Sequence, residues 1–323
     1  QLIVLAGSDQ SYDRASDRLW RMCGLRVSDQ SVRRACQVAG EQAKAYLEQS
    51  DQAAEPVAQA QEQVECLMDG AKVNTTEGWR EIRAVAICKR QPGPPADLRH
   101  WNDRYLPEPT ASWSWAGVAD ASQTGKQLRA MADRLGLGRG EGVSGLGDGA
   151  PWIWNQFDEH LPDHEGGLDV YHLSEHLHET GRLLHGQADA AAGSEAAQRW
   201  AEQQRAALFR LGSGRYLIEQ LLPLFEAYRT EQPASAATKA LRALLGYLWR
   251  HRHRLNYRDR LRRGLPIGSG QIEGVCKNTL NARLRKNNPR WRVENANRMA
   301  ALNCLHYSSL WDRFWTHTLP QAA

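Results

Sequence analysis

The order of strand-like and helix-like segments between residues 64 and 184 limits the possible folds more than any other feature of this sequence. VECLMDGAKVN and WREIRAVAICKR, joined by TTEG, predict two strands with a tight turn, and ASWSWAGVAD predicts a third. Beyond them we expect helix, strand, helix, strand and helix, in SQTGKQLRAMADRLG, GVSGLGDGA, WIWNQF, GLDVY and HLSEHLHETGRLLHG. A meander followed by crossovers predicts a mixed α/β domain of five strands.

The first 63 residues predict a helical segment and a connector. SYDRASDRLWRMCG stops at Gly24, and LRVSDQSVRRACQVAG starts a second helix with Ser28 as its N-cap. Two helices joined by a short turn, with Arg33 and Arg34 on a polar outer face, favour a DNA-binding helix-turn-helix. An ordinary helical hairpin is the alternative. The connector that follows is rich in Ala, Gln and Glu, and we expect an interruption near Pro56.

Two further regions complete the predicted organisation. Residues 185–262 carry no strand signal and predict an all-helical insertion. Residues 263–323 predict the final helices of the α/β core, at Gln271–Lys286 and Glu294–Leu305. Residues 64–184 would then be the first part of that core.

The positive charge of the chain is concentrated in one region. The overall net charge of +4 comes from 41 basic and 37 acidic side chains and indicates no particular partner. Between Arg250 and Arg298, however, 14 Lys or Arg residues stand against three acids. A solvated face would have this composition, but clustered arginines also supply contacts to phosphates, so the region is a candidate polyanion site.

Cysteine usage and hydropathy point to the cytoplasm. The six cysteines include no CxxC pair and no zinc-ligand spacing, which is typical of buried thiols in a reducing compartment. No signal peptide and no apolar run near 18 residues is present. The opening QLIVLAG reads as the interior of a domain, so we expect the chain to be a piece of a longer protein.

Three carboxylates from distant parts of the sequence are candidate metal ligands. Asp69 and Asp148 each precede a glycine, in MDGA and GDGA. We expect Asp69 to end or interrupt the first strand and Asp148 to follow the strand GVSGLG. In α/β sheets, sites gather at the carboxyl ends of strands. Glu273 follows the turn GLPIGSG in the first turn of a helix whose residues Ile272, Val275 and Cys276 form an apolar face, so that helix can dock on the sheet. Together the three acids would repel one another unless cations neutralise them, and oxygen ligands suit two Mg²⁺ or Mn²⁺ ions.

The sequence resembles bacterial insertion-sequence transposases of the Kra type, which are DDE enzymes related to the Mutator-like group. The resemblance runs from about residue 11 to residue 315. It is carried by the DGA after the first strand, by GDGAPWIW, LDVYHLSEHL and GLPIGSGQIEGVCKNTLNARLRKNNPRW, and by the terminal WDRFW. It implies a ribonuclease-H-like core with a helical insertion before the last acid. It also implies an N-terminal DNA-binding region and cut-and-join chemistry on the terminal inverted repeats of the element.

The same resemblance assigns roles to individual residues. Asp69, Asp148 and Glu273 become the catalytic, metal-binding acids, and Asp169 and His172 form the supporting Asp-x-x-His signature. The partner is double-stranded DNA, both the element ends and the target. A homo-oligomer is expected because two ends must be processed together. We expect DNA contacts from Ser31, Arg33, Arg34, Lys277, Arg283, Arg285, Lys286 and Arg290.

Other interpretations remain open at this point. A catalytically decayed transposase could act only by binding DNA. HLSEH places His172, Glu175 and His176 in the His-x-x-Glu-His arrangement of one class of zinc peptidases. Most of the 12 tryptophans should pack in the core, but Trp154 or Trp291 could stack on an unpaired base at a cleaved end.

Overall fold

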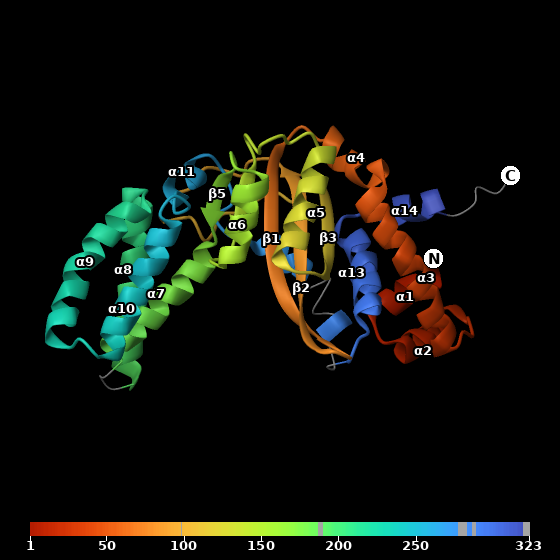
Figure 1. Ribbon diagram of the computed structural model, residues 1–323, viewed down its shortest axis with the longest axis horizontal. Helices are drawn as coiled ribbons and strands as arrows, with labels where there is room; N and C mark the ends of the chain where they lie inside the picture. Colours follow the sequence, from red (N-terminus) through yellow and green to blue (C-terminus); the bar gives the residue numbers. More distant parts are fainter. Residues whose placement is uncertain (98, 187–189, 277–282, 286–288, 319–323) are drawn as a thin grey trace.

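A five-stranded sheet with the order β3-β2-β1-β4-β5 lies in the middle of the protein (Figure 1). The computed structural model describes residues 1–97, 99–186, 190–276, 283–285 and 289–318. The strands are β1 (Gln63–Thr75), β2 (Gly78–Arg90), β3 (Ala111–Val118), β4 (Ser144–Gly147) and β5 (Glu165–Leu168). β1–β2 and β2–β3 pair antiparallel, whereas β1–β4 and β4–β5 pair parallel. The predicted mixed α/β sheet of five strands is therefore confirmed, and it is compatible with a ribonuclease-H-like fold.

β1 does not end at Asp69 but continues to Thr75, as the predicted strand VECLMDGAKVN does. Its pairing with β2 continues through Asp69↔Ala84 to Thr75↔Gly78, so the two strands form a long hairpin arm. Gly78 has a φ of +99°, which favours glycine at this turn. The parallel pairing of β1 with β4 ends earlier, at Leu67↔Leu146. Asp69 therefore lies just beyond the end of the parallel ladder although it is in the middle of its own strand.

Helices cover the sheet and connect its strands. α5 (Ala121–Arg134) packs against β2, and α6 (Pro151–His160) packs against β4 and α5. Both lie on the near side of the sheet in Figure 1. α12 (Gly270–Val275) contacts β1 and β2, and α13 (Val293–Tyr307) packs along β3. Cys66, Leu67 and Met68 are all buried, as expected for a central strand covered on both faces.

The N-terminal region is helical, as predicted. It contains α1 (Leu2–Asp9), α2 (Tyr12–Cys23), α3 (Asp29–Gln49) and α4 (Asp51–Gln59). α2 ends at Gly24 with a φ of +65°, and the Ser28 side chain caps α3. The expected break near Pro56 is not observed: Pro56 lies inside α4, and the helices separate at Ser50.

α3 is docked on the core along its length. It packs against α13, where Gly40 lies so close that a Cβ there would be 2.8 Å from the Arg298 carbonyl oxygen. The first turns of α3 bury Val32 and Cys36, while Ser31, Arg33 and Arg34 on the outer side of these turns are exposed. A DNA-binding role for this helix pair stays a prediction.

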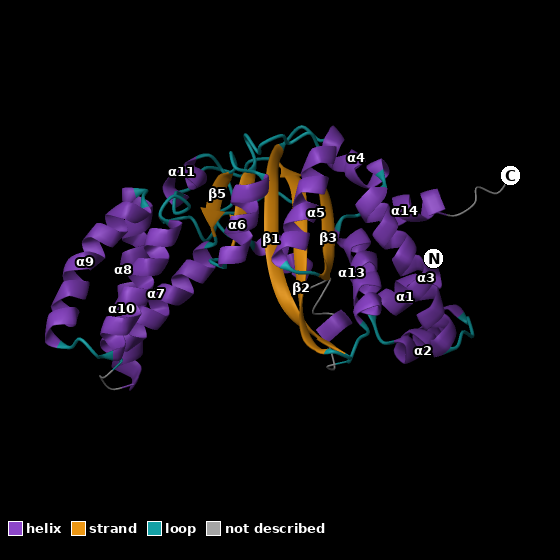
Figure 2. Ribbon diagram, viewed as in Figure 1, coloured by secondary structure: helices purple, strands orange, loops and turns teal. Residues whose placement is uncertain are grey.

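A helical lobe extends from the β5 side of the sheet (Figure 2). It is formed by α7 (Val170–His185), α8 (Ala190–Leu211), α9 (Gly214–Glu231) and α10 (Ala236–His251), and α11 (Tyr257–Arg262) leads back to the sheet. Part of the predicted helix Gln271–Lys286 lies outside the described residues, and its described start is α12. The chain continues through α13 and α14 (Trp311–Thr318). None of the helices in the described ranges is both long and apolar enough to cross a membrane.

Candidate active site at the ends of the parallel strands

Three acidic residues lie just beyond the parallel pairing of β1, β4 and β5. Asp69 lies beyond the last β1–β4 pair, Asp148 follows β4 and Asp169 follows β5. Since β1, β4 and β5 are neighbours and run in the same direction, their carboxyl ends lie at one edge of the sheet. Asp169 was predicted within a strand in GLDVY, but it is the N-cap of α7.

Asp69 and Asp148 line one pocket of about 330 Å³. Burial raises the pKa of the Asp69 carboxyl, and the nearby Asp148 carboxylate raises it further, while the Gly70 backbone N–H and the Cys276 thiol oppose the shift. The Asp148 Oδ1 atom accepts a hydrogen bond from the Ala150 backbone N–H at 2.7 Å. Two carboxylates therefore face a partly desolvated space in which their charges disfavour one another, a condition that a bound cation would relieve.

Asp169 joins the beginning of α7 to the beginning of α12. Its side chain is fully buried, and Oδ1 accepts hydrogen bonds from the backbone N–H groups of Tyr171 (2.7 Å) and His172 (2.9 Å). Oδ2 accepts from both the backbone N–H and the hydroxyl of Ser269, the latter at 2.7 Å. The Ser269 hydroxyl oxygen is also 3.3 Å from Glu273 Oε1. Ser269 occupies the N-cap position of α12, but its hydroxyl makes no capping hydrogen bond and instead connects two acids of the site.

Within the described residues, Asp169, His172 and Glu273 form a compact group of potential metal ligands. One donor atom from each lies within 4.8 Å of the other two. Each oxygen of Asp169 already accepts two hydrogen bonds, which occupies its lone pairs, so this residue is better suited to orient the group than to bind an ion. Asp69 and Asp148 are not members of this compact group, but the His172 imidazole is close enough to lower the pKa of Asp69.

The structure thus brings all five predicted site residues to one region, with a different internal arrangement from the expected triad. Asp69 and Asp148 share a pocket, whereas Glu273 lies with Asp169 and His172. Cys276, which follows α12, is hydrogen-bonded to Asp69 and connects the two sets. Carboxylate oxygens and one imidazole nitrogen suit Mg²⁺, Mn²⁺ or Zn²⁺, so the donor set allows metal binding without identifying the ion.

Sequence reasoning missed a tyrosine that comes from the helical lobe. Tyr247 on α10 packs against Gly149, where a Cβ would be only 2.3 Å from the tyrosine ring. Its hydroxyl is buried and has no hydrogen-bond partner in the described part of the chain. Burial raises the pKa of Tyr247, and the Asp148 and Asp169 carboxylates raise it further. No local sequence pattern connects this residue to the site.

The predicted DNA contacts occupy different environments. Ser31, Arg33 and Arg34 are exposed at the start of α3. Arg285 is exposed and lines the pocket of Asp69, and Arg290 is exposed beside Thr76, whose carbonyl oxygen is 3.4 Å from Arg290 Nη2. Lys277 and Lys286 lie outside the described residues.

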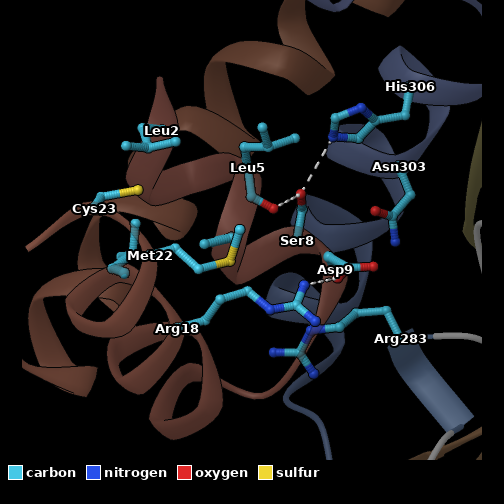
Figure 3. A pocket seen from close by; sticks show the side chains of 12 residues that line it. Leu2, Leu5, Ser8, Asp9, Arg18, Met22, Cys23, Arg283, Asn303 and His306 are labelled. Carbon is cyan, nitrogen blue, oxygen red and sulfur yellow. Dashed lines mark hydrogen bonds and ion pairs between the residues drawn. The ribbon is translucent and has the colours of Figure 1, made fainter.

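Arg283 is the exception among the described arginines proposed to contact DNA. It is 7% exposed, and its Nε donates to the Gly7 carbonyl at 3.2 Å. Its guanidinium lies 4.9 Å from the ring of Tyr12 and 5.0 Å from that of Trp291. Figure 3 shows it at a pocket between the N-terminal helices and α13, which is lined by both apolar side chains, such as Leu5, and polar ones, such as Asp9. This burial argues against the predicted phosphate contact, because the charge is used to hold α1 and α2 against the core.

Much of the basic segment around residues 250–298 is also compensated by acids from elsewhere. Arg254 pairs with Asp158 at 3.0 Å, and Arg298 pairs with Glu41 at 2.7 Å. Arg260 is completely buried and lies 3.3 Å from Glu165. The local charge excess in the sequence therefore overstates the positive charge available to a partner.

The geometry disfavours the zinc-peptidase alternative. The Nδ1 of His172 is 3.5 Å from Glu175, and this histidine belongs to the group with Asp169 and Glu273. The ring of His176 instead packs on Tyr247, with centroids 4.2 Å apart. The two histidines of the motif thus have separate partners, whereas a zinc site needs both at one ion.

Comparisons with known proteins do not assign the chain to a family: no family model matches the sequence, and no curated protein matches it significantly.

Proposed function

We propose that this protein is a DNA transposase of an insertion sequence, which cleaves and joins DNA strands by metal-dependent phosphoryl transfer. The observation that supports this proposal best is the meeting of Asp69, Asp148 and Glu273, together with Asp169 and His172, beyond the parallel strands. The sequence resemblance to Kra-type transposases assigns roles to the same five residues. The partners would be the terminal inverted repeats and target DNA.

Some residues of the site would bind the metal ions, and others would position the helices that carry these ligands. Asp69, Asp148 and Glu273 would hold Mg²⁺ or Mn²⁺, which when bound activates an attacking hydroxyl and stabilises the leaving oxygen. Asp169 would keep α12 in register with α7 through Ser269. His172 would contribute a nitrogen at the border of the two sets.

The proposed reaction has two in-line steps at this site. Water first attacks a phosphodiester at the end of the element and releases a 3′-hydroxyl. That hydroxyl then attacks a phosphodiester of the target, which joins the two DNAs, breaks the P–O bond on the far side of the phosphorus and releases the target's own 3′-hydroxyl. The protein contributes mainly positioning and neutralisation of charge, because the phosphoryl group needs little other assistance.

The test compares wild type with Glu273→Gln and Asp148→Asn on end-labelled duplexes that carry the inverted repeats, in Mg²⁺ buffer. We expect either substitution to reduce strand cleavage by about 100-fold or more while DNA binding persists. Glu179→Gln is the matched control, because Glu179 is exposed on α7 and is not part of the metal-ligand group. Equal cleavage by all four proteins would refute the proposal, and binding by wild type without cleavage would favour a DNA-binding protein that has lost its chemistry.

A further inference from the structure

The pocket that contains Asp69 and Asp148 is lined by basic and aromatic side chains as well as by acidic ones. Its other walls include the basic side chains of Lys72, Arg83 and Arg285 and the indole of Trp152. The volume of about 330 Å³ is at the lower end of the range for small-molecule sites. A space of this size admits one nucleotide but excludes a duplex.

Trp152 is held in a fixed orientation in this pocket. The guanidinium carbon of Arg83 lies 4.7 Å from the centre of the indole ring. Arg83 is itself fixed, because it pairs with Glu81 and donates to the Ala119 carbonyl at 2.8 Å. Trp152 is only partly buried, and it is one of the residues that line the pocket. A rigid, partly open aromatic ring beside basic groups is the arrangement that binds single-stranded nucleic acid.

The two tryptophans that the sequence suggested for this role are not accessible. Trp154 is 2% exposed, and its Nε1–H donates to the Asp148 carbonyl at 2.7 Å. Trp291 is 7% exposed, and its Nε1–H donates to the Leu284 carbonyl at 3.1 Å. Both are therefore engaged in packing, and Trp152 is the tryptophan that lines the pocket.

We propose, on the basis of the proposed DNA-cleaving function, that this pocket binds a single unpaired nucleotide whose base stacks on Trp152. The strand that reaches the carboxylates is then single-stranded next to the cut, and Lys72 and Arg83 lie beside its phosphates. The substrate class of the site is accordingly a DNA end with an unpaired or splayed nucleotide, rather than an intact duplex.

The experiment measures binding of the full chain to a DNA hairpin with a short 3′ overhang and to its blunt counterpart. 2-Aminopurine in the overhang reports stacking by fluorescence quenching, and Ca²⁺ replaces Mg²⁺ to prevent turnover. We expect Trp152→Ala to weaken binding of the overhang by about 5- to 150-fold and to abolish quenching, with little change for the blunt hairpin. Trp152→Phe should retain part of both effects. Trp249→Ala is the matched control, because Trp249 is exposed on α10 and carries a similar contact with Arg252, at 4.3 Å.

The outcomes separate this inference from the proposed function. Cleavage by wild type, together with equal overhang binding by wild type and Trp152→Ala, would refute the nucleotide site and leave the enzyme intact. Overhang binding that depends on Trp152, without cleavage in Mg²⁺ or Mn²⁺, would support the nucleotide site and refute the transposase. If Trp152→Ala unfolds, Trp152→Leu takes its place. Undiminished quenching by a folded Trp152→Leu variant would also refute stacking.

Discussion

The carboxylate of Asp169 holds Ser269 by two hydrogen bonds, one from its backbone N–H and one from its hydroxyl. The two residues are 100 positions apart in the sequence, and the whole helical lobe lies between them. This contact fixes the start of α12, and therefore Glu273, relative to the helix that carries His172. It explains how an acid that follows the long helical lobe in the sequence can reach the ends of the strands.

The first prediction concerns the stability that this contact provides. Asp169→Ala leaves the backbone N–H groups of Tyr171, His172 and Ser269 without their acceptor. Because each unsatisfied buried donor costs about 1–3 kcal/mol, we expect the free energy of unfolding to fall by roughly 3 kcal/mol or more. Urea denaturation measures the change. Asp163→Ala is the control: it removes an exposed pair with Arg139 and should cost about 1 kcal/mol or less. Equal losses in the two variants would show that Asp169 is not a structural anchor.

The second prediction concerns the contact of Gly149 with Tyr247. A Cβ at position 149 would lie 2.3 Å from the tyrosine ring, so Gly149→Ala must displace either α10 or the loop that carries Asp148. We expect a loss of about 1–3 kcal/mol in thermal or urea unfolding. The neighbouring Gly246→Ala is the control, because a Cβ there meets nothing within 4 Å and Gly246 lies in a helix, so it should stabilise by up to about 1 kcal/mol. If the stability losses of Gly149→Ala and Tyr247→Ala simply added in the double variant, the proposed clash between the two residues would be contradicted.

The third prediction is a loss of stability in acid that involves His251. Burial, together with the nearby charges of Arg254 and Arg250, lowers the pKa of this histidine to about 4. The folded protein therefore binds fewer protons than the unfolded chain, in which the histidine has its ordinary pKa of about 6.5. The contribution of neutral His251 to the free energy of unfolding is complete above pH 6.5 and is lost as the pH falls towards 4. Urea midpoints measured across this range should fall less steeply for His251→Phe than for wild type. Identical slopes would exclude His251 as a contributor.

The sequence predicted those elements of the fold that depend on local patterns. The two strand segments joined by TTEG and the helix signals at Gly24 and Ser28 all led to observed elements, because each reports a local backbone preference. The prediction of a break near Pro56 was wrong, because α4 tolerates the one backbone N–H that proline lacks. The helices are instead separated at Ser50, whose backbone is extended. Whether Asp69 ends, interrupts or lies within β1 depends on pairing with β2, which residue types alone do not settle.

The site was predictable only as a set of residue types. The motifs named Asp69, Asp148, Asp169, His172 and Glu273, and strand order explains why they meet. Which of them lie closest together depends on contacts between distant segments, such as Asp169 with Ser269. The same limit applies to arginines: counting charge in the sequence cannot show that Arg260 and Arg283 are buried.

The last prediction separates arginines that hold the structure from arginines available to DNA. Arg33 and Arg34 are exposed on α3, whereas Arg283 is buried against Tyr12 and Trp291. Loss of one phosphate contact reduces the slope of log K against log salt concentration by about 0.9. We therefore expect Arg33→Met and Arg34→Met each to reduce that slope by up to this amount in gel-shift titrations, with little change in stability.

Arg283→Met should show the opposite behaviour. Its DNA affinity and salt slope should stay at the wild-type values, because the guanidinium is not accessible to a phosphate. Its stability should change, since the variant loses the hydrogen bond to the Gly7 carbonyl and the two ring contacts that hold α1 and α2 to the core. Limited proteolysis would then cut first among the N-terminal helices. A reduced salt slope in Arg283→Met with unchanged proteolysis would instead place this arginine at the DNA, and would require α1 and α2 to move away from α13 when DNA binds.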